Sequence, residues 1–315
     1  MTSINVAAVA AAALFAATAA QAAGPLQKTQ APGYYRMLLG DFEVTALNDG
    51  TVKLPVDKLL RAPEAKVKKA LARNFLAPPV ETSVNAFLVN TGSKLVLIDT
   101  GAAGLFGPTL GNLIANLKAA GYQPEQVDEV YITHMHPDHV GGLVAGGSPA
   151  FPNAVVRADQ RDADFWLSQA NLDAAPNDSK GFFQGAMASV NPYVQSGRFK
   201  AFNGATELVP GVKARPTYGH TAGHTIYEIE SQGQKLVLWG DLMHVAAVQF
   251  ADPSVTIQFD SDFKAAAVQR KSAYAEAAAK GYWVGAAHLS FPGVGKLAKE
   301  GGGYRFVPVN YSGLK

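Results

Sequence analysis

Three histidines and one aspartate fall within six residues, in the segment His134-Met135-His136-Pro137-Asp138-His139. The apolar run from Glu129 to Ile132 predicts a short buried strand, so this cluster begins where a strand ends. Side chains two positions apart in an extended chain point the same way, so the first two histidines can bind one ion. The turn expected at the proline directs the aspartate and the third histidine toward a second position. The segment therefore predicts a metal site.

Neutral imidazoles and carboxylates suit zinc and its neighbours better than calcium or magnesium, which prefer oxygen ligands. Four side chains cannot complete two metal sites, so further ligands are expected downstream. The candidates stand beside apolar runs or glycines, at His220 or His224, Asp241 and His288. A polar loop with solvated histidines is the alternative interpretation, and the spacing His-x-His-x-Asp-His after an apolar strand makes it the weaker one.

The order of these motifs, with Leu97-Ile98-Asp99-Thr100-Gly101 upstream, resembles the metallo-β-lactamase superfamily of dinuclear metallohydrolases. The resemblance covers nearly all of the chain after about residue 35. It implies an α+β fold, an αββα sandwich with a dinuclear metal site at one edge between the two sheets.

The same resemblance assigns a role to each candidate side chain. The first metal is expected on His134, His136 and His220, the second on Asp138, His139 and His288, and Asp241 is expected to bridge the two. Asp99 is expected to orient a ligating imidazole by accepting its other N–H, while His224 belongs to the turn and is not expected to bind metal.

Three segments resemble methyl parathion hydrolases more closely: Ala31 to Glu43, Thr100 to Gly107 and Tyr304 to Tyr311. Members of that subgroup hydrolyse organophosphate triesters, aryl esters or lactones. The resemblance places six residues around the substrate: Phe106, Trp166, Phe182, His244, Ile257 and Phe259. For the first three, ordinary core packing is an equal alternative, and His244 has the alternative of an imidazole that touches no substrate.

The last three of these residues are larger than those expected in organophosphate hydrolases, so they are predicted to narrow the pocket. A planar lactone or aryl ester such as dihydrocoumarin fits a narrow pocket better than a branched thiophosphate does. Lactone or aryl-ester hydrolysis is therefore the first expectation, with weak phosphotriesterase activity beside it. A dedicated methyl parathion hydrolase is the second.

The expected chemistry is that of two divalent ions about 3.5–4 Å apart, which bind a hydroxide between them and polarise the substrate oxygen. Asp138 and Asp241 are the expected catalytic carboxylates. Zinc is the expected metal, with Mn²⁺, Co²⁺, Fe²⁺ and Cd²⁺ as alternatives. β-Lactamase and thioesterase chemistry share such a centre, whereas a non-catalytic binding protein would be metal-free.

Composition limits the classes of protein that the chain can belong to. Its 315 residues, 48% of them hydrophobic, can bury a large core, and no shift in composition divides residues 23–315, which we expect to form one domain. The net charge is +2, without the basic run of a nucleic-acid-binding groove. The expected partner is a small ester, lactone or phosphotriester, and the resemblance implies a homodimer.

Residues 1–22 carry no charged side chain and end in Ala20-Gln21-Ala22, an A-x-A cleavage pattern. This predicts a signal peptide and a periplasmic or secreted protein, although the segment lacks the usual basic residue near its start. The run is too short and too weakly apolar for a membrane anchor. The absence of cysteine suits an oxidising compartment. A cytoplasmic protein with an alanine-rich start is the alternative.

Periodicity and turn residues predict the remaining elements. Hairpins are expected around Asn48-Asp49-Gly50 and around Thr91-Gly92-Ser93. Helices are expected over 64–75, 109–120 and 262–280, the last ended by Gly281. Short strands are expected at 225–230, 235–239 and 282–287, and residues 171–179 are expected to form a loop.

Overall fold

The computed structural model describes residue 24 and residues 26–314, so the predicted signal peptide, residues 1–22, lies outside the described residues. The chain divides into two units, residues 1–31 and residues 32–315, and the fold below is that of the second. Among the helices of the described part, none has the length and apolar character that a membrane crossing requires.

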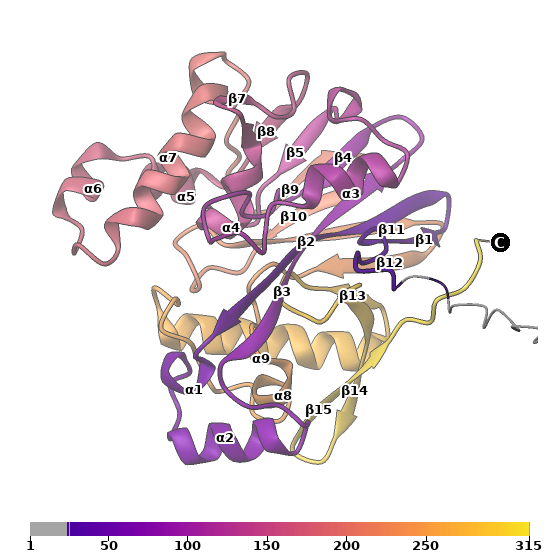
Figure 1. Ribbon diagram of the computed structural model, residues 1–315, viewed down its shortest axis with the longest axis vertical. Coiled ribbons are helices and arrows are strands. Elements are labelled where there is room, and N and C mark those ends of the chain that lie inside the picture. The colour runs from indigo at the N-terminus through magenta and orange to yellow at the C-terminus, as the bar shows by residue number, and fades with distance from the viewer. Residues whose placement is uncertain (1–23, 25, 315) are drawn as a thin grey trace, which may run out of the picture. The chain divides into compact units, whose positions relative to one another are not determined.

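Two large mixed β-sheets lie face to face within residues 32–314, with helices on their outer surfaces (Figure 1). The first sheet has the order β1 (Tyr34–Leu39), β2 (Phe42–Leu54), β3 (Val80–Asn90), β4 (Leu95–Ile98), β5 (Glu129–Tyr131), β8 (Val155–Arg157). The second has the order β15 (Gly303–Pro308), β14 (Val294–Glu300), β13 (Trp283–Gly285), β12 (Gln234–Leu238), β11 (Thr225–Ser231), β10 (Val212–Pro216), β9 (Thr206–Val209). The short strands β6 (Val144–Ala145) and β7 (Ser148–Pro149) pair separately. Pairing is parallel at β4/β5, β5/β8 and β12/β13, and antiparallel between the other neighbours.

Strand alternation separates the core into layers, because successive side chains point to opposite faces of a sheet. In β4, Val96 and Ile98 point into the core between the sheets, while Leu95 and Leu97 point to the outer core. In β12, Leu236 and Leu238 point between the sheets. Strands that are apolar on both faces must be covered on both sides, so each sheet also needs a layer of helices.

The helices supply that outer layer. They are α1 (Val56–Leu59), α2 (Glu64–Ala72), α3 (Leu113–Ala119), α4 (Pro137–Val140), α5 (Gln160–Trp166), α6 (Gln169–Ala174), α7 (Lys180–Gln195), α8 (Ala246–Gln249) and α9 (Phe263–Lys280). Helices α3 and α7 share a buried cluster with the first sheet, and α9 shares another with the second. The predicted α+β class and αββα sandwich are confirmed.

Several predicted elements are confirmed with shifted ends. Strands β3 and β4 form the hairpin predicted around residues 91–93. Helix α2 covers most of the range predicted from residue 64. Helix α9 begins after Asp262, whose side chain accepts a hydrogen bond from the N–H of Ala265, and ends at Gly281, which has a left-handed φ of 65°.

The hairpin predicted at Asn48-Asp49-Gly50 is wrong, because these residues form a bulge inside the single long strand β2. The Asp49 carboxylate accepts hydrogen bonds from the N–H groups of Ala102 and Leu113, so it ties two distant loops to the strand. Gly50 has a φ of 136°, and a Cβ there would lie 2.1 Å from the carbonyl oxygen of Thr109. These residues therefore form a bulge, and the glycine in it leaves room for the close approach of the backbone at Thr109.

Two further predictions need correction. The helix expected from residue 109 begins only at Leu113, because Gly111 adopts a φ of 93° that a helix does not accommodate. The loop expected at 171–179 contains part of α6, whose N-cap Ser168 accepts a hydrogen bond from the N–H of Asn171. No residue of α6 is buried, which explains why its sequence lacks an apolar stripe.

Candidate metal centre

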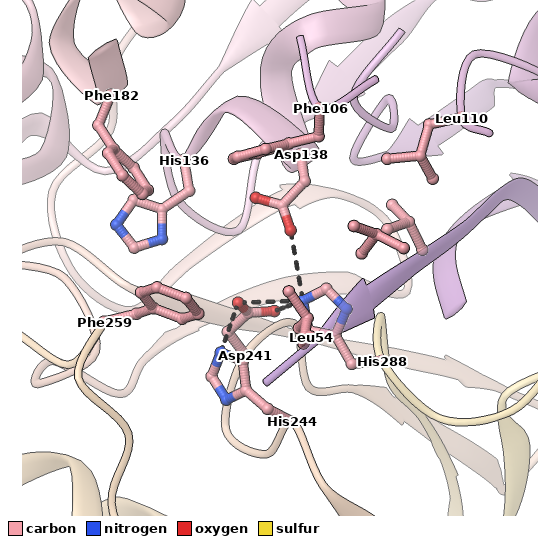
Figure 2. A pocket seen from close by; sticks show the side chains of 12 residues that line it. Leu54, Phe106, Leu110, His136, Asp138, Phe182, Asp241, His244, Phe259 and His288 are labelled. Carbon is pink, nitrogen blue, oxygen red and sulfur yellow. Dashed lines mark hydrogen bonds and ion pairs between the residues drawn. The ribbon is translucent and has the colours of Figure 1, made fainter. Parts of the chain in front are cut away.

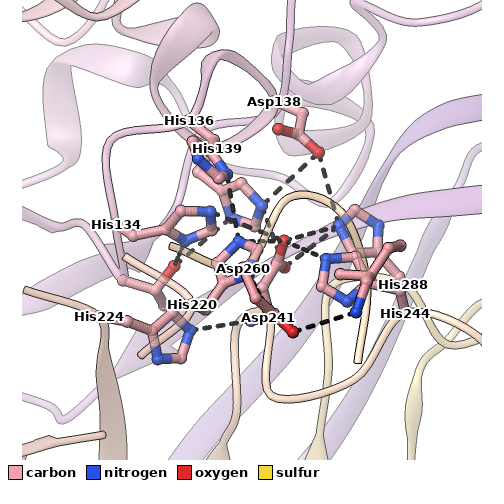
Figure 3. Close-up of polar contacts among 12 residues, drawn as sticks. His134, His136, Asp138, His139, His220, His224, Asp241, His244, Asp260 and His288 are labelled. Atoms are coloured by element: carbon pink, nitrogen blue, oxygen red, sulfur yellow. Dashed lines mark hydrogen bonds and ion pairs between the residues drawn. The ribbon is translucent and has the colours of Figure 1, made fainter. Parts of the chain in front are cut away.

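Seven predicted ligands converge from four separate segments of the chain (Figure 3). One segment follows β5 and continues into α4, and it carries His134, His136, Asp138 and His139. The other ligands lie in the loop before β11, the loop after β12 and the loop after β13; they are His220, Asp241 and His288. The carboxyl ends of β5, β12 and β13 therefore place their loops at the same edge of the sandwich.

The first group of ligands is formed by His134, His136, His220 and Asp241, whose ligand atoms all lie within 4.8 Å of one another. Asp241 Oδ2 lies 3.3 Å from His220 Nε2 and 3.6 Å from His134 Nε2. His136 Nδ1 lies 3.1 Å from His220 Nε2. All four side chains are buried.

The second group contains Asp138, His139 and His288, again within 4.8 Å of one another. Asp138 Oδ2 lies 3.5 Å from His288 Nε2 and 3.6 Å from His139 Nε2. The other carboxylate oxygen of Asp241, Oδ1, lies 3.1 Å and 3.2 Å from the same two nitrogens. Asp241 thus presents one oxygen to each group, as a bridging carboxylate would.

Hydrogen bonds on the far side of four imidazoles fix which ring nitrogen carries the proton. Nδ1 of His139 donates to Asp99 at 2.8 Å, and Nδ1 of His288 donates to the carbonyl oxygen of Ser83 at 2.9 Å. Nδ1 of His220 donates to Asp260 at 2.8 Å. Each of these rings therefore turns Nε2, the nitrogen with the free lone pair, toward the cluster.

His134 reaches the same state through Thr133. The hydroxyl of Thr133 donates to Asp99 at 2.8 Å, so its oxygen is free to accept from Nδ1 of His134 at 3.1 Å. Nε2 of His134 and Nε2 of His139 have no hydrogen-bond partner although both are buried, and the same holds for Oδ1 of Asp241. Buried polar atoms without partners are rare in folded proteins, and these point at one another. The donor set fits two divalent ions.

The electrostatics agree with that assignment. Burial lowers the pKa of His134 and of His136 well below the usual value, so both rings are neutral at pH 7 and able to bind metal. For Asp241, burial acts to raise the pKa, but the surrounding imidazoles, His288 foremost, hold it well below its usual value. For His139, His220 and His288, burial acts to lower the pKa, but the neighbouring carboxylates raise it above the usual value, to about 9 for His220. Without metal the cluster therefore combines neutral and protonated imidazoles around an ionised carboxylate, and metal binding would release protons from the latter imidazoles.

Asp99 and His224, the two residues expected to support the ligands, both lie at the cluster. Asp99 has a left-handed φ of 59° and also accepts a hydrogen bond from the N–H of Thr133 at 2.8 Å. His224 faces away from the ligand atoms: its Nδ1 bonds the Thr217 hydroxyl, and its Nε2 accepts from the N–H of Asp241 at 3.0 Å. His224 therefore fixes the backbone of the bridging aspartate.

Two buried acids that were not predicted also support the centre. Asp162, in α5, accepts hydrogen bonds from the N–H of Met135 at 2.8 Å and from that of Gly223 at 2.6 Å. It thereby ties the loop of the first two histidines to the loop of His220. Asp260 holds His220 directly. An isolated aspartate in a helix or a loop carries no spacing signal, so the sequence alone could not single these two out.

His244 lies deeper in the cluster than a pocket residue needs to. Its Nε2 is 3.0 Å from Asp241 Oδ2, and its ring stacks on that of His288 at 5.2 Å. Asp241, His244 and His288 also satisfy the geometry of a metal-binding group. His244 also lines the floor of the cavity described below, and its role in substrate binding stays a prediction.

A small cavity of about 100 Å³ opens onto the cluster (Figure 2). Its floor contains His136, Asp138, Asp241, His244 and His288, and its walls are apolar. The aromatic walls are the predicted Phe106, Phe182 and Phe259. The remaining wall is aliphatic and was not predicted; it consists of Val52, Leu54, Val84 and Leu110. Three of these four come from the long strands β2 and β3, far in sequence from the metal-binding segments.

Two predicted pocket residues lie elsewhere. Trp166 lines a neighbouring cavity of about 380 Å³ that also reaches His136, His220 and Phe259, and its ring lies 5.2 Å from that of His136. Ile257 does not line the cavity at the cluster; it is fully buried among Val56, Leu60 and Val255. A turn at Gln258 and Phe259 separates the two residues, so Phe259 faces the cavity while the side chain of Ile257 packs into the core.

A family model described as the metallo-beta-lactamase superfamily matches residues 79–288. An N-acyl homoserine lactonase from Bacillus cereus is 27% identical over 212 residues, which cover 62% of this chain and 76% of the relative.

Two solved structures match over nearly the whole chain. The hydrolase AbOPH of the beta lactamase superfamily is 38% identical with a TM-score of 0.86, covering 90% of this chain and 100% of that chain. AidC, described as a dizinc quorum-quenching lactonase in complex with a homoserine product, is 26% identical with a TM-score of 0.82, covering 89% and 99%.

Proposed function

Since the chain belongs to the metallo-beta-lactamase superfamily, we propose that it is a dizinc hydrolase of lactones and aryl esters. The observation that carries the proposal is the set of unpartnered, buried Nε2 atoms around Asp241 at the floor of an apolar cavity. The similarity to lactonases supports the lactone as substrate.

Two divalent ions in such a donor set would make a water easier to deprotonate near neutral pH, and would supply an electrophile for the ester carbonyl. The seven ligands named above would hold them. No serine or cysteine nucleophile is needed, and the chain has no cysteine at all.

Asp138 is the carboxylate that can handle protons during ring opening. It lines the cavity, and its side chain keeps 19% of its exposure against 3% for Asp241. Its carboxylate therefore faces both the cluster and the cavity. Oδ2 of Asp138 is turned toward His139 and His288, so we propose that its other oxygen, Oδ1, accepts a proton as water attacks and returns it to the alkoxide that leaves.

The shape of the cavity favours a flat substrate. The rings of Phe106 and Phe259 lie 6.3 Å and 6.4 Å from that of Phe182, so aromatic faces bound the cavity on one side. The aliphatic wall bounds it on the other. A planar lactone fused to an aromatic ring can lie between these walls, whereas two alkoxy groups on one phosphorus need space in several directions.

The test is a comparison of kcat/KM on one zinc-loaded preparation with dihydrocoumarin, N-hexanoyl homoserine lactone and methyl parathion. We expect the preferred lactone to exceed methyl parathion by about a hundredfold, equivalent to about 2.7 kcal/mol in transition-state stabilisation. A preference for N-hexanoyl homoserine lactone over dihydrocoumarin would place an acyl chain along the aliphatic wall.

Two results would contradict the proposal. A preference for methyl parathion would make the protein a dedicated organophosphate hydrolase. Purified protein that takes up neither zinc nor Mn²⁺, Co²⁺, Fe²⁺ or Cd²⁺, as measured by elemental analysis after dialysis against each metal, would leave only a non-catalytic binding protein.

A further inference from the structure

A fully buried charged side chain lies next to the residues that support the metal centre. Arg270, in α9, is fully buried although arginine is among the residues least often found inside proteins. A buried guanidinium is costly unless its N–H groups are satisfied, so its partners show what it holds in place.

The partners of Arg270 belong to the two loops that build the site. Nε donates to the carbonyl oxygen of Leu242, the residue directly after the bridging aspartate. Nη1 donates to the carbonyl oxygen of Val255 at 2.8 Å and to that of Pro253 at 3.4 Å. This second loop continues into Phe259 of the cavity wall. One side chain thus fixes the distance between the metal-bridging loop and the wall.

The remaining nitrogen of the guanidinium faces Asp260. Nη2 of Arg270 lies 3.7 Å from Oδ2 of Asp260. The other oxygen of Asp260 accepts the Nδ1–H of His220 at 2.8 Å, and Figure 3 labels both of these residues. Both side chains of the Arg270–Asp260 pair are at most 1% exposed, so water screens this interaction little. The line of contacts runs from helix α9 to a predicted ligand of the first metal.

Gln249 also connects the loop after Asp241 to the loop that contains Val255, by hydrogen bonds to both. It is fully buried, and its Oε1 accepts hydrogen bonds from the N–H groups of His244 at 2.7 Å and Val245 at 2.9 Å. Its Nε2 donates to the carbonyl oxygen of Val255 at 3.0 Å, which Arg270 also contacts. Two buried side chains therefore meet on one carbonyl group.

We propose that Arg270 is a positioning residue of the metal centre. It orients Asp260 so that Asp260 accepts the Nδ1–H of His220 and His220 turns Nε2 toward the metal, and it holds the Asp241 loop against the cavity wall. The proposal rests on the metal centre put forward above. It goes further, because Arg270 touches neither a predicted ligand nor the cavity.

The test measures zinc affinity by competition with a chromogenic chelator for four proteins: wild type, R270M, D260N and the double variant. Residues that orient ligating imidazoles typically contribute 10- to 100-fold in metal affinity. We expect R270M to weaken the binding of one zinc ion by a factor in that range, and to add less than threefold in the D260N background.

R215M is the matched control for lost helix anchoring. Arg215 also pairs with α9, through Glu276 at 2.8 Å, but its other ion pair is to Glu228 on β11 and it reaches no ligand. R215M should lower the thermal unfolding temperature and leave zinc affinity unchanged. If R270M does not fold, R270Q, which keeps N–H donors but not the charge, takes its place in the same comparison.

The outcomes separate this inference from the proposed function. Wild-type protein without zinc affinity would refute the function itself. Zinc binding that is normal in wild type and equally normal in R270M, with only the stability lowered as in R215M, would refute the role of Arg270. Fully additive losses in R270M and D260N would show that Arg270 does not act through Asp260.

Discussion

Replacing His244 by leucine tests whether this histidine acts on the substrate or on the metals. Its Nε2 lies 3.0 Å from Asp241 Oδ2, while Asp241 keeps its contacts with four other imidazoles, at 3.1–3.6 Å. Burial lowers the pKa of His244, so the ring is neutral at pH 7 and can donate one hydrogen bond. We expect H244L to retain the metal content of wild type.

Two effects determine the expected change in kcat/KM of H244L: the loss of a hydrogen bond from the imidazole and the gain of apolar surface in the cavity. The ring nitrogens of His244 have no hydrogen-bond partner among the described residues, so we expect the ring to donate one hydrogen bond to the charged oxygen of the transition state. Such a bond contributes about 1.5–3 kcal/mol, so its loss should lower kcat/KM for the lactone by roughly 10- to 150-fold. Leucine also extends the apolar wall beside Phe259, whose ring lies 6.2 Å from that of His244. One added buried methylene contributes about 0.8 kcal/mol, so methyl parathion hydrolysis should rise about fourfold.

The assay measures kcat/KM for both substrates and metal content on the same preparation, for wild type, H244L and H244Q. Glutamine keeps a polar group of similar length, so H244Q should lose less lactone activity than H244L. Loss of metal in H244L would assign His244 to the ligands, as its grouping with Asp241 and His288 allows. An unchanged ratio between the substrates would show that His244 does not touch them.

Three further changes give measurable outcomes. D241A removes the oxygens shared by both ligand groups, so elemental analysis should find less than one metal per chain and hydrolysis should fall at least a thousandfold; two bound metals would contradict the bridge. D99N weakens the support of His139 and should lower metal affinity by about 10- to 100-fold in chelator competition, whereas wild-type affinity would show that this contact is dispensable. Burial raises the pKa of Asp162 to about 6, so the native metal-free protein binds a proton that the unfolded chain has lost between about pH 4 and pH 6. This group should therefore make stability fall as pH rises through that window, by up to about 3 kcal/mol, and urea denaturation of wild type and D162N should show a difference that changes with pH; a constant difference would refute it.

The metal ligands could be predicted because they lie in short sequence segments with recognisable residue types and spacing. Four of them stand within six residues, and each of the others follows or precedes an apolar strand beside a glycine or an alanine run. Strand ends converge at sheet edges, so the side chains there meet in the folded chain. The sandwich was predicted on the same basis, from a resemblance carried by those motifs.

The supporting residues could not be predicted, because their role depends on tertiary contacts. Asp260 and Arg270 are a loop aspartate and a helix arginine, and only the fold brings them behind His220. The aliphatic wall comes from β2 and β3, where an apolar residue is equally expected to be core. At residues 48–50 the sequence predicted a hairpin turn, but the structure has a β-bulge there. Turns and bulges favour the same residue types, so the sequence could not distinguish them.

The origin of the ligands in both sheets has a mechanical consequence. His134 and His136 follow a strand of the first sheet, whereas Asp241 and His288 follow strands of the second. Ions bound here would cross-link distant parts of a chain that has no cysteine for disulfides, closing loops whose freedom the unfolded chain otherwise regains. Bound metals would cross-link the two sheets at this edge. We therefore expect unfolding of the metal-bound protein to begin with separation of the sheets at the opposite edge.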